Sequence, residues 1–136
     1  MERIKDILYV KRNQIVGGKE MRVLCCGDRN WTSYEIIRRE LEKFDDNTVI
    51  IEGCANGADS ISAYIARQLG YRVLEFPAYW KKYGKAAGPI RNTQMLDEGK
   101  PDLVLAFHTN IENSKGTKNM IEQSKKRGIK VVLIKE

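Results

Sequence analysis

The chain has 136 residues, 42% of them hydrophobic and 31% charged, which is the composition of one ordinary globular domain. Its longest apolar runs are about five residues, far below the ~20 that a membrane span needs, and no signal-peptide core occurs, so we expect a cytoplasmic protein without a membrane partner. The 24 Lys and Arg against 18 Asp and Glu give a net charge of +6, which indicates an anionic partner, polymeric or small.

The cysteine and histidine content argues against metal and disulfide chemistry. Cys25, Cys26 and Cys54 form no C-x-x-C pair, and we interpret all three as small buried side chains at strand ends. His108 is the single histidine of the sequence, which excludes a zinc site built on two histidines. We predict no metal and no cofactor.

The first 20 residues stand apart from the rest of the chain. They contain "DILYV", a possible strand, and an arm, an extra edge hairpin and a flexible leader all remain open for residues 1–20. From residue 21 onward short apolar runs alternate with helix-like segments, and we predict one domain over 21–136. The expected strands are 21–27, 48–53, 71–76, 102–107 and 129–134.

Helix signals occupy the segments between these strands. Thr32 and Glu35 have the spacing of a capping box at the start of the first helix. After a long loop over 77–88, Pro89 occupies the expected first position of another helix. The remaining helical patterns cover 32–44, 58–70 and 114–128.

Strands that alternate with helices indicate a parallel sheet covered on both faces. Right-handed crossovers then predict an α/β fold, a Rossmann-like doubly wound sheet of five strands in the order 3-2-1-4-5. The winding reverses between the first and fourth strands, and such sheets bind ligands at the carboxyl ends of the strands there. The loops after residues 27, 53 and 107 therefore form the expected binding region.

Two of these loops join a strand to a helix through glycine. In "GDRNWTS", Gly27 permits a tight turn, Arg29 offers a bidentate clamp, and both packing and base stacking are open for Trp31. In "EGCANGAD", Asp59 either caps the next helix or, like Asn56, accepts hydrogen bonds from a ribose. Both loops suit a phosphate group.

Two further loops add cations and aromatic rings. The stretch "FPAYWKKYGKAAGPIRN" has four Lys or Arg and no acid, which favours a nucleotide, although a solvated basic loop with packed aromatics is the alternative. In "SKGTKNM", Gly116 and Thr117 form an anion-friendly helix start, and His108 is a minor candidate. The four loops together predict a small phosphorylated ligand.

These four motifs, in this order and spacing, resemble the YspA-like (YAcAr) branch of the SLOG superfamily, which includes the Smf/DprA proteins and the LOG phosphoribohydrolases. The resemblance covers about residues 21–136. It implies a Rossmann-like fold that binds nucleotides or derivatives such as ADP-ribose, frequent homo-oligomers, and for phage-encoded members second-messenger signalling or phage–host conflict. Loops and resemblance together predict the ligand-binding residues Gly27, Asp28, Arg29, Asn30, Trp31, Gly53, Asn56, Gly57, Asp59, Trp80, Lys85, Gly88, Arg91, Asn92, Gly116 and Thr117.

One departure from the LOG pattern bears on catalysis. The LOG motif "PGGxGTxxE" supplies a glutamate for N-glycosidic chemistry, whereas Met120 stands at that position here and cannot act as an acid or base. We therefore expect a binding protein, a sensor or a sequestering protein for an ADP-ribose-like or cyclic nucleotide signal. A nucleotide N-glycosidic hydrolase is the first alternative, with Asp28 or Asp59 in place of the glutamate, and a DprA-like nucleic-acid binder is the second.

Overall fold

A computed structural model of the chain describes residues 20–136, and the predicted arm or hairpin of residues 1–20 lies outside the described residues except for Glu20. In chain order the elements are β1 (Met21–Gly27), α2 (Tyr34–Leu41), β2 (Thr48–Glu52), α3 (Ala58–Gln68), β3 (Arg72–Glu75), α4 (Trp80–Tyr83), η1 (Gly84–Ala86), α5 (Ala87–Gly99), β4 (Leu103–Phe107), η2 (Ile111–Asn113), α6 (Lys115–Lys126) and β5 (Lys130–Ile134).

The five strands form one parallel sheet in the order β3-β2-β1-β4-β5. The predicted fold class and strand order are confirmed. β2 and β4 are buried along their whole length, because helices cover both faces of the sheet, whereas the edge strands β3 and β5 are partly exposed. Among the described residues, no helix is both long and apolar enough to cross a membrane.

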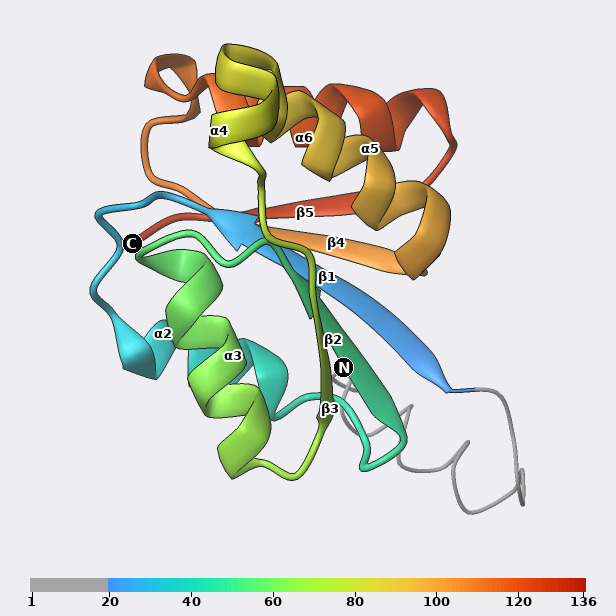
Figure 1. The fold of residues 1–136 in the computed structure, drawn as a ribbon. Coiled ribbons are helices and arrows are strands. Elements are labelled where there is room, and N and C mark those ends of the chain that lie inside the picture. The colour runs from blue at the N-terminus through green and yellow to red at the C-terminus, as the bar shows by residue number, and fades with distance from the viewer. Residues whose placement is uncertain (1–19) are drawn as a thin grey trace.

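Two helical layers enclose the sheet (Figure 1). α2 and α3 lie on one face, and α4, α5 and α6 lie on the other. β1 serves both layers because its side chains alternate: Val23 and Cys25 join the core under α2 and α3, whereas Leu24 and Cys26 join the core under α5 and α6. The carboxyl end of this central strand therefore lies at the junction of both layers.

Local details differ from the sequence predictions in four places. Ser33, not Thr32, caps α2, since its hydroxyl accepts the Ile36 N–H at 3.3 Å. The expected loop over 77–88 contains the short helices α4 and η1, and Pro89 is the third residue of α5, which begins at Ala87. Cys25 and Cys26 are buried as predicted, but Cys54 is exposed, with a φ of 63°, because it follows the end of β2.

Candidate functional site

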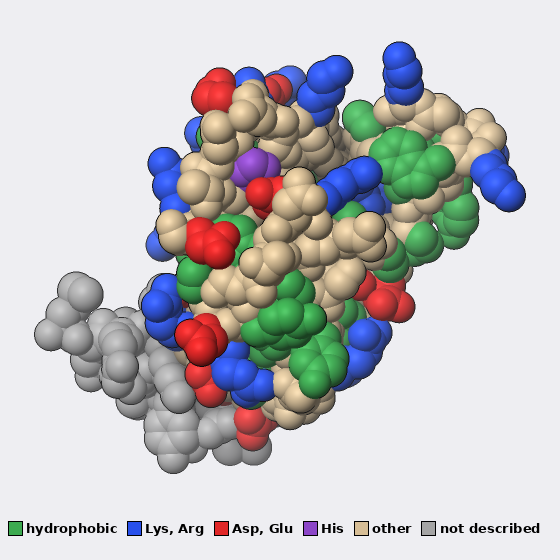
Figure 2. Space-filling view, turned by 90° about the vertical axis from the view of Figure 1, so that its left-hand side faces the viewer, with side chains coloured by type: hydrophobic (Ala, Val, Ile, Leu, Met, Phe, Trp, Pro, Cys, Tyr) green, Lys and Arg blue, Asp and Glu red, His purple; other side chains and the backbone are tan. Residues whose placement is uncertain are grey.

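A cavity of about 640 Å³ lies at the carboxyl ends of β1 and β4, where the strand order reverses. All four predicted loops contribute residues to it. Figure 2 shows this side of the molecule, with the single histidine recessed in the hollow and acidic and basic side chains beside it. Met95 of α5 and Met120 of α6 supply apolar lining.

Most of the predicted ligand-binding residues line this cavity. They are Gly27, Asp28, Arg29, Asn30, Asp59, Trp80, Lys85, Gly88, Arg91, Asn92, Gly116 and Thr117. Within residues 20–136, the predicted Trp31, Gly53, Asn56 and Gly57 do not line it. The sequence prediction missed Cys26, Ala55, Pro89, Met95, Asn113, Ser114 and Met120 as lining residues, while His108, the minor candidate, and Lys115 of the fourth loop do line the cavity.

The missed residues differ in whether the sequence could have revealed them. Ser114 precedes the "KGT" helix start and could have been assigned as its cap. Met95 and Met120 lie on apolar helix faces, which sequence patterns assign to the core, and they are indeed almost fully buried. No sequence pattern distinguishes a core methionine from one beneath a cavity.

The first two loops are joined through the backbone of Asp28. Its carbonyl oxygen accepts hydrogen bonds from the N–H groups of Trp31 at 3.1 Å and Ala58 at 3.0 Å. Gly57 has a φ of +72°, and a Cβ there would overlap the carbonyl oxygens of Asp28 and Arg29. The first amide of α3 is therefore occupied by the neighbouring loop.

Trp31 packs into the protein interior. Its side chain is 3% exposed, and its ring lies 5.7 Å from that of Phe107 in a tilted arrangement. The indole N–H donates to the Ser33 carbonyl at 2.9 Å. This placement corresponds to the packing alternative, since both the ring and its polar atom have protein partners.

Asp59 does not cap α3, because the cap position is Gly57 and the carboxylate turns back toward the preceding loop. Its Oδ2 accepts the N–H groups of Gly53 at 3.1 Å and Ala55 at 3.3 Å. Burial raises the pKa of Asp59 to about 6, against the opposing influence of the Arg91 guanidinium. A carboxyl group that titrates near neutrality thus lines the cavity.

A chain of side-chain hydrogen bonds runs beneath the cavity from β2 to α6. Arg91 donates from Nη1 to the Gly53 carbonyl and from Nε to Asn92 Oδ1 at 3.2 Å. Asn92, itself buried, donates from Nδ2 to the Gly116 carbonyl at 3.2 Å and to Asn119 Oδ1 at 3.1 Å. The second loop and the start of α6 are therefore held at a fixed separation.

Cations and one aromatic ring stand at the rim. The guanidinium carbon of Arg29 lies 5.6 Å from the centre of the Trp80 ring, a cation–π distance that joins the first loop to α4. Trp80 is 48% exposed, and Lys85 and Lys115 are exposed on the same rim. The rim therefore combines positive charge with a half-exposed aromatic ring.

The start of α6 offers donors to the cavity. Ser114 Oγ accepts the Thr117 N–H at 3.0 Å and thereby caps the helix. Among the described residues, the amides of Lys115 and Gly116 have no protein acceptor. Free amides at a helix N-terminus favour an anion.

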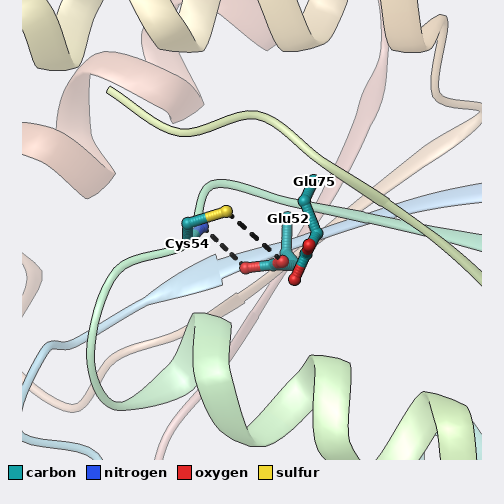
Figure 3. A group of neighbouring side chains, drawn as sticks. All are labelled: Glu52, Cys54 and Glu75. Carbon is teal, nitrogen blue, oxygen red and sulfur yellow. Dashed lines mark hydrogen bonds between the residues drawn. The ribbon is translucent and has the colours of Figure 1, made fainter. Parts of the chain in front are cut away.

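A separate carboxylate pair lies outside the cavity (Figure 3). Glu52 and Glu75 occupy paired positions on β2 and β3, and a ligand atom from each lies within 4.8 Å of Cys54 Sγ. Glu52 is 1% exposed, and its Oε1 accepts the Cys54 N–H at 2.7 Å. Burial raises the pKa of Glu52 to about 7, while the Arg67 guanidinium, 3.1 Å away, lowers the pKa of Glu75.

The cysteine of this group is poorly suited to act as a nucleophile. Cys54 is exposed as a residue, but partial desolvation of its thiol, followed by the charges of Glu52 and Glu75, raises the pKa of that thiol to about 11. Thiolates rather than thiols attack electrophiles and bind metals. None of these three residues was among the predicted site residues.

Comparison with known proteins places this Rossmann-like fold in a family. Residues 21–83 match the YspA, cpYpsA-related SLOG family (YAcAr). The chain is also 35% identical over 120 residues to the Gene 61 protein of Mycobacterium phage D29, an alignment that covers 82% of this chain and 94% of the phage protein. The chain belongs to the YspA, cpYpsA-related family of SLOG proteins.

A solved structure shares the fold. DNA processing protein A (DprA) from Streptococcus pneumoniae is similar with a TM-score of 0.63 and 19% sequence identity. The match covers 84% of this chain and 50% of DprA, so the chain spans about half the length of that protein. This likeness supports the fold assignment.

Proposed function

We propose that the chain binds a phosphorylated, nucleotide-derived small molecule in the cavity, as a sensor or a sequestering protein. ADP-ribose-like molecules and cyclic nucleotides are the proposed ligands. The observation that carries the proposal is the combination of free amides at the start of α6, cations at the rim and an exposed ring at Trp80 around one cavity. Its volume of about 640 Å³ lies within the range typical of small-molecule sites.

Each part of a nucleotide has a matching surface. The amides of Lys115 and Gly116 suit a phosphate, and the charges of Arg29 and Arg91 suit the same group or a second one. Trp80 offers a ring face for a base. The mixture of cations and apolar lining favours an amphiphilic anion over a simple inorganic one.

A thermal shift panel of AMP, ADP-ribose, a cyclic ADP-ribose isomer and cyclic dinucleotides tests the proposal. We expect at least one nucleotide to raise the melting temperature, and Arg29→Ala to weaken its binding about ten-fold or more, since a charge-assisted hydrogen bond is lost. Arg39→Ala, which removes an exposed cation of α2 that does not line the cavity, is the control. Absence of any shift at millimolar ligand would overturn the proposal.

The phage relative supports a biological setting for this binding. The similar Gene 61 protein is encoded by a mycobacteriophage. We propose that the chain senses or sequesters a nucleotide signal in a conflict between phage and host, in the cytoplasm and as a homo-oligomer. Light scattering of the purified chain with and without ligand tests the oligomer.

A hydrolase is the second candidate, and Asp59 favours it. This carboxyl group lines the cavity, and its raised pKa of about 6 suits proton transfer near neutral pH. Met120, which stands where the LOG motif has its glutamate, lines the same cavity and cannot act as an acid or base. A hydrolase would therefore need another carboxyl group, such as that of Asp59. Chromatography after incubation with nucleoside monophosphates or ADP-ribose tests hydrolysis, and product formed by the wild type but not by Asp59→Asn would favour this candidate.

Nucleic-acid binding is the third candidate. Residues 115–136 carry seven Lys or Arg against Glu122 and Glu136, and the fold is similar to that of a protein named for DNA processing. Binding to a polymer predicts an affinity that falls steeply with salt. A gel shift that is absent, or that does not respond to salt, counts against it.

A further inference from the structure

We propose that His108 is a specificity-determining residue of the cavity. Its imidazole carries a proton on Nε2, and this N–H donates a hydrogen bond to an acceptor oxygen of the bound ligand. This inference rests on the proposed function, because it names the role of one residue in the same site.

His108 holds a fixed position at the end of the central sheet. It directly follows β4, and its backbone N–H donates to the Ile134 carbonyl of β5 at 3.0 Å. The residue is 7% exposed and lines the cavity. Its ring therefore has little freedom to leave the cavity wall.

The hydrogen bonds of the ring determine where its proton lies. The Asn110 N–H donates to His108 Nδ1 at 3.1 Å, so Nδ1 presents a lone pair and carries no proton. The neutral imidazole then carries its single proton on Nε2. The ring is thus an acceptor toward its own chain and a donor at its other end.

That donor is unused within the protein. Among residues 20–136, Nε2 has no hydrogen-bond acceptor. Ser62 Oγ is the only fully buried side-chain N or O atom of the described residues that lacks a partner, so Nε2 is not sealed away from solvent. Since His108 lines the cavity, the cavity supplies this access.

The neighbouring groups define what the donor recognises. Free amides of Lys115 and Gly116 open into the same cavity, and these are donors as well. A ligand group that meets such donors acts as an acceptor, as an ionised phosphate oxygen does. The Nε2–H of His108 is a donor that suits such an oxygen.

A purely structural role makes a different prediction. If His108 served only to hold the Asn110 N–H, an asparagine could replace it, because asparagine Oδ1 lies near the place of Nδ1. His108→Asn keeps this acceptor and removes the cavity donor. His108→Gln instead places an amide N–H near the position of Nε2, and so restores the donor.

The test begins with the ligand-free protein. His108 is the only histidine, so ¹⁵N NMR of the side-chain imidazole at about pH 8 shows a single set of signals without assignment. We expect a protonated Nε2 and an unprotonated Nδ1. The opposite tautomer overturns the inference, whether or not any nucleotide binds.

Binding is then measured with AMP and ADP-ribose as probes. We expect His108→Asn to weaken binding about ten-fold, and His108→Gln to stay within about three-fold of the wild type, since one hydrogen bond to a charged group is lost or kept. Unchanged binding by His108→Asn overturns the inference. If the wild type binds neither these probes nor any nucleotide of the panel, the proposed function fails. The role of His108 toward a ligand then fails with it, even where NMR shows the expected tautomer.

Discussion

The backbone N–H and the backbone carbonyl of Gly53 each form a hydrogen bond with a side chain from a different helix. Its N–H donates to Asp59 Oδ2, and its carbonyl accepts from Arg91. A Cβ at this position would lie 2.5 Å from Arg91 Nη1, so the arginine occupies the space that a side chain would need. The shape of the cavity wall thus depends on a residue that does not itself line the cavity.

The cost of close packing at Gly57 can be measured by comparing an alanine substitution there with one at Gly128. Gly57 and Gly128 share a φ of +72°, but a Cβ at Gly128 meets nothing within 4 Å, whereas one at Gly57 overlaps two carbonyl oxygens. We expect Gly128→Ala to cost about 1 kcal/mol through backbone strain alone, and Gly57→Ala about 3 kcal/mol through strain and overlap. Urea unfolding of both variants measures this difference. Equal costs would contradict the described contact between the two loops.

Glu52 makes stability depend on pH. Its pKa in the folded protein is raised from 4.5 to about 7, so the folded state binds a proton more tightly than the unfolded state. The resulting stabilisation is complete below about pH 4.5 and is lost as the pH rises through about 7. We expect Glu52→Gln, which retains an acceptor for the Cys54 N–H, to lose less stability than the wild type between about pH 5 and pH 8.

Urea unfolding at the two pH values checks this expectation. Asp59 has a raised pKa as well, so the variant keeps part of the slope in the same direction. Glu122→Gln, an exposed change on α6, is the control. A Glu52→Gln profile parallel to that of the wild type would show that the buried carboxyl group is not responsible.

At the scale of helices and strands, the sequence predicted the strands well because buried parallel strands are nearly continuous apolar runs. The strand order followed from right-handed crossovers. The predicted cap of α2 was wrong by one position, because Thr32 and Ser33 are adjacent hydroxyl residues that sequence spacing alone does not separate. α4 was missed because four residues are too few to show a helical period.

The site was predictable to the extent that it follows from the sheet. Loops after parallel strands must meet at one edge, so most of the proposed binding residues line one cavity. The rest depends on long-range contacts. Glu52 ends an apolar run and is buried, and it lies beside Glu75 through a β-pairing that no local pattern encodes.

Substitutions at the caps of two helices are expected to have similar effects on stability but different effects on binding. Ser33 caps α2 and Ser114 caps α6, but only Ser114 lines the cavity. We expect Ser33→Ala and Ser114→Ala each to cost about 1 kcal/mol in unfolding free energy. Only Ser114→Ala is expected to weaken nucleotide binding, since it loosens the first turn of α6. Calorimetry of unfolding and of binding measures both quantities, and a binding loss in Ser33→Ala would contradict this division.

At the scale of the whole molecule, the protection of backbone amides against hydrogen exchange should decrease from the centre of the sheet outward. β1, β2 and β4 are interior strands with mostly buried residues, whereas β3 and β5 are edges with exposed positions. We therefore expect amides of the interior strands to exchange hydrogen most slowly, and those of α4 and η1 among the fastest. Hydrogen exchange followed by mass spectrometry of peptides checks this order, which fails if β5 is protected as strongly as β4.

The contact between Arg29 and Trp80 has a consequence for kinetics. Arg29 lies in the loop that follows β1 and Trp80 begins α4, and the two side chains meet at the cavity, with 5.6 Å between the guanidinium carbon and the ring centre. If the proposed ligand lies beneath this contact, we expect the attraction between the two side chains to slow its dissociation more than it changes its rate of association. On the proposed function, the residence time of the ligand would then depend on this contact between one arginine and one tryptophan.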